Sequence, residues 1–160
     1  MPTRTLEIPA SITTSRATLD DLDALAALFD AYRVFYAQAS DPPVARAFLQ
    51  ARLQRGESVV FLARDAAGGR ALGFTQLYPS FSSVSAHRTW ILNDLFVAPS
   101  ARKRGVARAL MNCARAFAIE TAALRMVLET AEDNAPAQAL YESLGYVRET
   151  GTRHYSLELA

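Results

Sequence analysis

Four basic residues gather around one glycine in the middle of the chain, a combination typical of a site for phosphate groups. Arg102, Lys103, Arg104 and Arg108 surround Gly105. A glycine lets a ligand approach the backbone closely, and the first turn of a helix carries unpaired N–H groups and a partial positive charge. If a helix begins here, a diphosphate is the natural ligand. The glycine patterns of a P-loop and of a dinucleotide-binding fingerprint are both missing.

Two other interpretations of this basic segment stay open at this point. It can be an ordinary solvated loop, or a patch that binds nucleic acid. The chain has 17 Lys and Arg against 16 Asp and Glu, for a formal net charge of +1. A chain with such balanced charges has no overall positive electrostatic field to attract nucleic acid or anionic lipid. This argues against nucleic acid and against a membrane as partners.

The elements that must position this segment follow from hydrophobic periodicity. Thr18 predicts a helix N-cap, and a second helix is expected from Asp41, with Pro42 first, to Gly56. Helices are also expected over 106–123 and 136–144, with a Ser-rich loop over 79–86. Strands are expected over residues 12–16, 58–63, 72–78, 89–97, 125–130, 146–149 and 154–159.

This order of elements predicts one domain over residues 1–160, with its core at about 12–159. The long helix between strands 89–97 and 125–130 requires a parallel pair. The fold class expected is mixed α/β, with helices on both faces of a mixed sheet. No apolar leader and no run of 18 apolar residues is visible, which favours a cytoplasmic protein away from membranes. Cys113, the single cysteine, is expected in the core, and no metal site is expected.

Two segments of the chain resemble motifs of the GNAT superfamily of acyl-CoA N-acyltransferases. Arg102-x-x-Gly105-x-Ala107 after an apolar strand fits that family's [Arg/Gln]-x-x-Gly-x-[Gly/Ala] loop. Residues 134–146 resemble its Asn-x-x-Ala-x-x-Leu-Tyr-x-x-x-Gly-[Phe/Tyr] segment. Strand 90–97 is similar to that of spermidine/spermine N-acetyltransferases and of histone-acetyltransferase-like bacterial members. The resemblance implies a GNAT-type twisted sheet, mostly antiparallel with a central parallel pair and about four helices, and a possible homodimer.

The resemblance also implies acetyl-CoA as the acyl donor and assigns residues to it. Backbone groups of Leu95, Phe96 and Val97 would bind the pantetheine arm, and one such N–H could stabilise an oxyanion. Asn134 would contact the cofactor near its thiol end, although Asn before Ala-Pro also suits a helix N-cap. The pyrophosphate and its charge would be held by residues of the basic segment: Arg102, Lys103, Arg104, Gly105, Val106, Ala107 and Arg108.

Tyr141 is implied as the proton donor to the departing thiolate. It lies seven positions after Asn134, so the two share a helix face. A thiol has a pKa near ~8.5 and a tyrosine near ~10, so full transfer costs roughly 2 kcal/mol, which is small beside a chemical barrier. Tyr141 can also be a packing tyrosine, or only a hydrogen-bond donor to sulfur.

The acceptor implied is a primary amine, which must be neutral to attack the thioester directly. Asp94 and Glu129 are the carboxylates proposed for catalysis, through a water, and Glu129 also for amine binding. Asp94 can instead be a structural acid near the end of its strand. Relatives often have an acid where Asn93 stands; an amide cannot be a base, so Asn93 is proposed only to bind substrate. Phe35 and Tyr36 are expected either in the core or lining the acceptor pocket, which the loop 80–85 also shapes.

A small amine, such as a polyamine or amino acid, is the acceptor that we expect. One alternative is a protein lysine or N-terminal acetyltransferase. An alternative of another class is a non-catalytic acyl-CoA-binding regulatory module, which would not need an acid near the sulfur. A plain interaction domain that kept the fold would not bind CoA at all.

Overall fold

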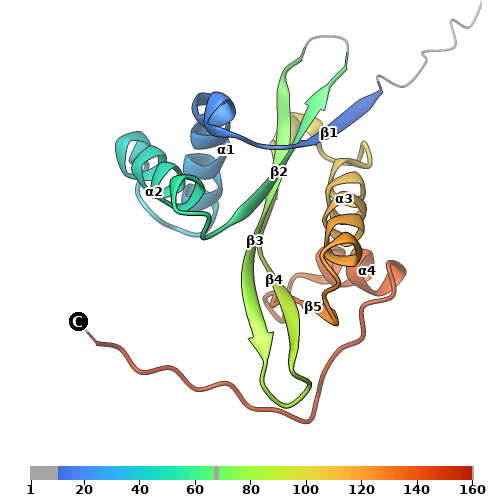
Figure 1. The fold of residues 1–160 in the computed structure, drawn as a ribbon. Coiled ribbons are helices and arrows are strands. Elements are labelled where there is room, and N and C mark those ends of the chain that lie inside the picture. Colours follow the sequence, from blue (N-terminus) through green and yellow to red (C-terminus); the bar gives the residue numbers. More distant parts are fainter. Residues whose placement is uncertain (1–10, 67–68, 160) are drawn as a thin grey trace, which may run out of the picture. The chain divides into compact units, whose positions relative to one another are not determined.

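A five-stranded sheet forms the centre of the first of two compact units in the computed structural model, which describes residues 11–66 and 69–159. The first four strands are antiparallel, and the fourth and fifth are parallel (Figure 1). The strands lie side by side in chain order: β1 (Ile12–Arg16), β2 (Val59–Asp65), β3 (Ala71–Ser82), β4 (His87–Val97) and β5 (Arg125–Val127).

Helices cover both faces of this sheet, as the sequence predicts (Figure 1). α1 (Leu22–Phe35) follows a short 3-10 turn that Thr18 caps through a reciprocal pair of bonds with Asp20 and Asp21. α2 (Pro42–Gln54) begins where the Asp41 carboxylate accepts the Val44 N–H. α3 (Val106–Glu120) covers the opposite face. The N-cap predicted at Thr18 and the helix start predicted at Asp41 and Pro42 are therefore confirmed.

The core lies on both sides of the sheet, which explains the apolar runs of its central strands. On one face, Leu25 of α1 and Leu49 of α2 are fully buried against a cluster that includes Phe74 and Phe96. On the other face, the Phe117 ring of α3 lies 5.2 Å from Trp90 and 5.5 Å from Phe61, centroid to centroid. Burial of this apolar area, at about 25 cal/mol per Å², is what holds the helices to the sheet.

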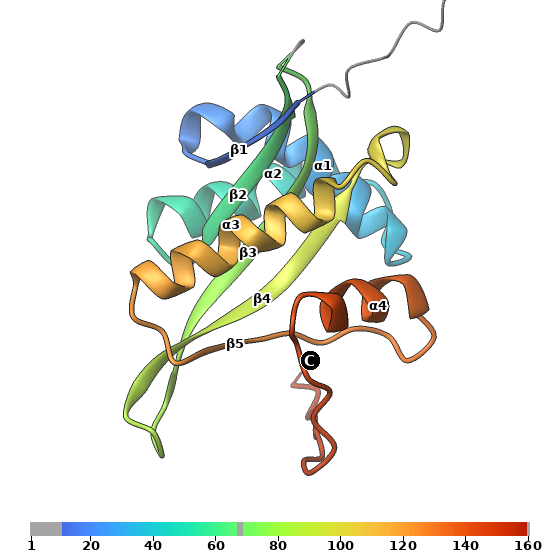
Figure 2. The ribbon, with the colours of Figure 1, turned by 90° about the vertical axis from the view of Figure 1, so that its right-hand side faces the viewer.

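The Ser-rich loop predicted over 79–86 is wrong. β3 continues to Ser82 and pairs with β4 from His87, so only residues 83–86 form the turn (Figure 2). Pro79 does not break the strand, because β3 pairs with β2 only as far as Leu77. Beyond that point one edge of β3 has no strand to bond, and a proline, which lacks an N–H, is tolerated on an edge.

The second unit starts at Glu129 and contains α4 (Ala135–Ser143). The strands predicted over 146–149 and 154–159 are wrong, since residues 146–159 contain neither strand nor helix. Tyr155 and Leu157 do alternate as on a strand face, yet both are exposed. Alternation predicts a face, but a strand forms only through a ladder to a partner.

Two differences from the expected sheet follow. β5 covers three residues instead of six, and the parallel pair β4–β5 closes one edge of the five-stranded sheet. The mixed, mostly antiparallel sheet with a parallel pair and four α-helices is nevertheless the architecture predicted. The prediction that 1–160 is one domain stays a prediction.

Candidate functional site

A β-bulge at Asn93 turns the second half of β4 toward α1. Gln76 pairs with Asp94 and Leu77 pairs with Leu92, so Asn93 is the extra residue. Trp90 contacts α3 and Phe96 contacts α1, although both have even numbers. Side chains alternate along a strand, so the alternation must reverse at the bulge. The reversal places the Asp94 carboxylate on the α1 side.

The pairing between β4 and β5 ends directly before this bulge. Their parallel pairing covers only Thr89, Trp90 and Ile91, whereas β4 continues to Val97. Within the described chain, no strand pairs with the outer edge of β4 after Ile91. A strand edge of this kind offers main-chain N–H and C=O groups to an extended ligand. The predicted pantetheine residues, Leu95, Phe96 and Val97, lie on this stretch.

The loop after β4 has the backbone shape that the phosphate prediction requires. Gly105 is the N-cap of α3 with a φ of 82°, and no side chain caps the helix. Lys103 also has a positive φ, 62°, which is uncommon outside glycine. A loop with such left-handed residues before a helix forms a concave set of N–H groups that suits an anion. The predicted start of the helix at Val106 is confirmed.

Gly73 lets this loop and β4 pack against β3. A β-carbon at Gly73 would lie 2.5 Å from the Phe96 carbonyl oxygen and 3.3 Å from the Val106 Cγ1. At Gly105, by contrast, a β-carbon would meet no atom within 4 Å. Gly105 is therefore needed for its left-handed backbone, and Gly73 for the room it leaves.

Two of the basic side chains of the loop are engaged with neighbouring elements. Arg102 donates its Nε to the Val97 carbonyl at 3.2 Å and lies 5.8 Å above the Phe35 ring. Arg104 lies 3.6 Å from the Asp65 carboxylate at the end of β2. These contacts fix the loop to the sheet and to α1. The cofactor roles of Lys103, Ala107 and Arg108, like those of Arg102 and Arg104, stay predictions.

Asp94 is the centre of a buried polar network on the α1 face. Its side chain accepts hydrogen bonds from the Gln76 Nε2 at 2.6 Å and the Asn93 Nδ2 at 3.1 Å. The Tyr32 hydroxyl also donates to it. The Gln76 amide further donates to the Tyr78 hydroxyl at 3.1 Å. Each partner donates to Asp94, which is the pattern around a carboxylate acceptor.

Both tyrosines of the network are held in their protonated forms. Burial raises the pKa of Tyr32, and the neighbouring Asp94 charge adds to this effect. Burial and the same charge raise the pKa of Tyr78 to about 12. Loss of either proton would place a second negative charge beside the carboxylate. At neutral pH both hydroxyls therefore remain donors.

The aromatic residues at the end of α1 lie beside the stretch of β4 that is predicted to bind the pantetheine arm. The Phe35 ring is 6.5 Å from the Phe96 ring and 5.2 Å from Tyr36. Phe35 is 58% exposed and Tyr36 is 54% exposed, so the core interpretation is wrong for both. Asn93 is also exposed. That these three residues bind the acceptor stays a prediction.

Three predicted site residues lie in the second unit. Asn134 is the N-cap of α4, and its side chain accepts the Ala137 N–H at 3.4 Å. Tyr141 lies on α4 with its ring 6.1 Å from that of Tyr146. The exposed Glu129 carboxylate is 3.4 Å from the His154 Nδ1. Their catalytic and cofactor roles stay predictions.

Other groups offer little further chemistry. Cys113 is a free, partly buried thiol on α3. Across residues 11–66 and 69–159, no three His, Cys, Asp or Glu side chains come close enough to hold a metal ion. No helix in the described part of the chain is long and apolar enough to span a membrane.

Sequence reasoning missed Gly73, Gln76, Tyr32 and Tyr78. Gly73 stands inside a strand pattern, and an isolated glycine there signals a bulge or a close backbone approach. The polar Gln76 in the apolar run 72–78 was a comparable signal. For Tyr32 and Tyr78 no sequence signal exists, because their proximity to Asp94 depends on the bulge.

Comparison with known proteins gives independent support for the resemblance to the GNAT family. A family model described as the acetyltransferase (GNAT) family matches residues 24–146. The chain is 47% identical over 144 residues to the uncharacterized N-acetyltransferase YhfO of Bacillus subtilis (strain 168), covering 90% of this chain and 95% of the relative.

Solved structures agree. A crystal structure of a probable acetyltransferase has a TM-score of 0.88 and 47% identity, covering 92% of this chain and 98% of its own. An aminoglycoside N-acetyltransferase in complex with CoA has a TM-score of 0.77 over 93% of this chain and 96% of its own. At 20% identity, that second likeness is one of fold alone.

Proposed function

Because the chain belongs to the acetyltransferase (GNAT) family, we propose that it transfers the acetyl group of acetyl-CoA to the primary amine of a small molecule. That it is an acetyl-CoA-dependent N-acetyltransferase follows from the family. The small-molecule acceptor, a cytoplasmic location and a homodimer are our proposals. One observation carries the proposal. The pairing of β4 with β5 ends directly before the bulge, which leaves an open β4 edge next to the left-handed loop that precedes α3.

Acetyl-CoA supplies an activated thioester. On the side of the protein, the open β4 edge from Leu95 to Val97 supports main-chain binding of the pantetheine arm. A preorganised N–H on this edge would stabilise the negative charge that develops on the acyl oxygen. Since these donors are fixed by the β3–β4 ladder, they need no rearrangement during the reaction.

The loop and first turn of α3 fit a pyrophosphate. Lys103 and Gly105 both have positive φ, and the N-terminus of α3 has no side-chain cap that would compete with a ligand. A helix N-terminus favours a negative group through its unpaired N–H groups and its dipole. The residues proposed for this role are those of the 102–108 segment.

On the α1 face, the network around Asp94 is proposed to receive the acceptor amine. The amine arrives as an ammonium and must lose a proton before it attacks. A buried carboxylate attracts the cation, and through a water it can take the proton. Asp94 is the primary candidate for this role because it is 4% exposed and joined to Tyr32 and Gln76. Glu129 remains the alternative base.

Tyr141 is proposed as the proton donor to the thiolate, on the motif resemblance. Its hydroxyl would donate a proton to the sulfur as the C–S bond of the thioester breaks. Asn134 is proposed to contact the same end of the cofactor while it caps α4. A protein lysine or N-terminal acetyltransferase is the alternative acceptor class.

The test has two stages. Calorimetry should detect acetyl-CoA binding to the wild type, and ligand at ~100 times Kd should add roughly 2.7 kcal/mol of stability. Gly105→Glu, which places a bulky anion on the left-handed residue, should abolish this. Thiol release is then followed with polyamines, amino acids, aminoglycosides and a lysine peptide. Activity on the peptide alone would show that the acceptor is a protein and not a small molecule. Binding of acetyl-CoA without thiol release would favour a regulatory module.

A further inference from the structure

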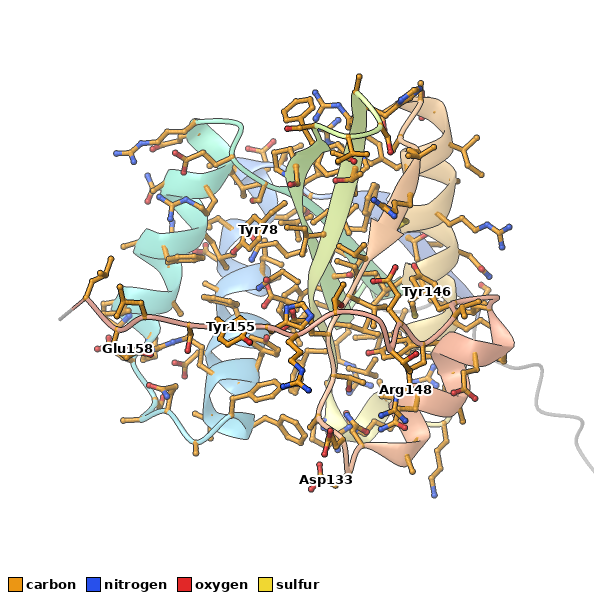
Figure 3. All side chains as sticks on the ribbon, turned by 90° about the horizontal axis from the view of Figure 1, so that it is seen from below. Tyr78, Asp133, Tyr146, Arg148, Tyr155 and Glu158 are labelled. Atoms are coloured by element: carbon orange, nitrogen blue, oxygen red, sulfur yellow. The ribbon has the colours of Figure 1, made fainter. Side chains whose placement is uncertain are left out.

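An open depression of about 570 Å³ lies on the α2–β3 side of the first unit. Phe48 and Arg52 of α2, Glu57, and Tyr78 and Pro79 of β3 line it. Its volume is in the range of small-molecule sites, and its walls combine aromatic surface with a few polar groups. Figure 3 shows Tyr78 on the side of β3 that faces α1 and α2.

Arg52 is held in place at this depression by two contacts. Its guanidinium lies 4.8 Å above the Phe48 ring, and its Nε is 2.5 Å from a Glu57 carboxylate oxygen. An arginine fixed on a ring through stacking and one ion pair still has its two terminal nitrogens as donors. Within the described residues, no other acidic group pairs with Arg52.

Tyr78 supplies a second donor to the same depression. Its hydroxyl oxygen accepts the Gln76 amide, so its own proton is directed elsewhere. Burial keeps that proton in place, with a pKa of about 12, while the positive charge of Arg52 acts on the same hydroxyl in the opposite direction. Gln76 bridges onward to Asp94. The depression is thus joined by one hydrogen-bonded chain to the proposed amine site.

We propose that the amine acceptor also has a carboxylate group, which binds at this depression between Arg52 and the Tyr78 hydroxyl. The acceptor class is then an amino acid or a similar amine with an acidic group. This inference rests on the proposed function. The pairing of a planar guanidinium with a carboxylate is bidentate and charge-assisted, which gives it direction as well as affinity.

A polyamine fits the same surface less well. Its second cation would have only Glu57 as a partner, and Glu57 is already committed to Arg52. Binding a cation there would pull apart this ion pair and place two positive charges side by side. A carboxylate, by contrast, leaves the Arg52–Glu57 pair intact and can accept from the Arg52 terminal nitrogens and from the Tyr78 hydroxyl.

The experiment compares amino acids with their carboxamides as acceptors for the full-length protein with acetyl-CoA. Each pair has the same amine and side chain but differs in the carboxylate. The wild type should prefer the acids by tenfold or more in kcat/KM. Arg52→Gln should bring the two classes to within about twofold, mainly through the KM of the acid, with the KM of acetyl-CoA unchanged. Tyr78→Phe should lower the preference by a few fold.

Arg55→Gln is the matched control, because Arg55 is exposed and does not line the depression. Arg52→Lys keeps the charge without the planar fork, so a properly folded Arg52→Lys enzyme should recover only part of the preference. Calorimetry of the same amino acids on the CoA complex provides a readout that does not need turnover. Equal use of acids and amides, an unchanged preference in Arg52→Gln, or neither binding nor turnover of any acid would each overturn the inference. Acetyl-CoA binding with thiol release to neutral amines would leave the proposed function standing in all three cases.

Discussion

The two sides of the β4 bulge present different chemical groups, main-chain groups on one side and side chains on the other. On the side proposed for the cofactor, the open edge of β4 and the left-handed loop before α3 present main-chain groups, and their shape depends on the glycines at 73 and 105. On the α1 and α2 side, Asp94, Gln76, Tyr32 and Tyr78 present side chains joined to each other. A main-chain site depends on backbone shape and tolerates many side chains, whereas a side-chain network depends on each member.

This difference matches the chemistry proposed for each side. A family that uses one donor needs one backbone shape to bind it, so the loop can stay the same while acceptors differ. The acceptor side must distinguish one amine from another, and buried polar groups do this strongly because a wrong partner leaves them unpaired. Substitutions on the two sides should accordingly affect different measured constants.

Asp94→Asn should have the largest effect and should leave the cofactor side untouched. The amide would point a donor at the amides of Gln76 and Asn93, and it has no charge to attract an ammonium. We expect a loss of about 10²-fold or more in kcat/KM for the acceptor, with the Kd of acetyl-CoA changed less than twofold. Steady-state kinetics and calorimetry on the same variant check both parts.

The matched control is a double variant that exchanges the carboxylate of Asp94 with the amide of Gln76. Asp94→Asn combined with Gln76→Glu restores a donor and an acceptor between positions 76 and 94. We expect it to recover most of the lost thermal stability and little of the activity. Recovery of full activity would show that Asp94 only orients its neighbours.

Gly73→Ala should have the next largest effect, on the opposite side. Its β-carbon would push the Phe96 carbonyl and Val106, which belong to the edge proposed to bind the cofactor. Overpacking of this kind costs about 1–3 kcal/mol, and we expect the affinity for acetyl-CoA to fall about tenfold. Gly151→Ala is the control, because a β-carbon there meets no atom within 4 Å. A folded Gly73→Ala protein with unchanged affinity would separate Gly73 from the cofactor edge.

The same contrast explains what the sequence predicted. Local signals sufficed for the cap at Thr18 and for the helix starts at Asp41 and Val106, since a helix start depends on residues within one helical turn. The loop proposed to bind phosphate could be located because its glycine and its helix are adjacent in the chain. Asp94 was identified as a candidate through the resemblance of strand 90–97 to the corresponding strand of the family.

The partners of Asp94 were not predictable in the same way. Gln76 meets Asp94 only because the β3–β4 register shifts at Asn93, and the alternation of the sequence does not show which strand bulges. The 79–86 segment was misassigned because serines and a proline suggest a loop, while pairing to β4 decides otherwise. The C-terminal strands failed for the opposite reason, since their alternation had no ladder to join.

Asn134→Ala tests a side chain that acts on the backbone, and a smaller effect is expected. Loss of the cap on the Ala137 N–H should lower the free energy of unfolding by about 1 kcal/mol. Asn134→Ser restores a cap, so it should recover most of that loss in urea unfolding. If Asn134 also contacts the cofactor, as proposed, both variants should weaken acetyl-CoA binding equally. An effect on stability alone would leave Asn134 as a cap.

Tyr78→Phe should have the smallest effect on the free energy of unfolding, and this effect on stability appears only in alkali. Because the folded-state pKa is raised from about 10 to about 12, the folded form favours the protonated hydroxyl. The stabilising contribution is fully present below pH ~10 and is lost as the pH rises toward about 12, where the unfolded tyrosine is already ionised. Tyr78→Phe should flatten this alkaline limb in urea unfolding between pH 9 and 11.5, with Tyr32 contributing the remainder. Tyr155→Phe, at a side chain that is 90% exposed, is the control and should leave the limb unchanged. If the limb is as steep in Tyr78→Phe as in the wild type, the Tyr78 proton is not held by the network, and its use as a donor to a bound carboxylate loses support.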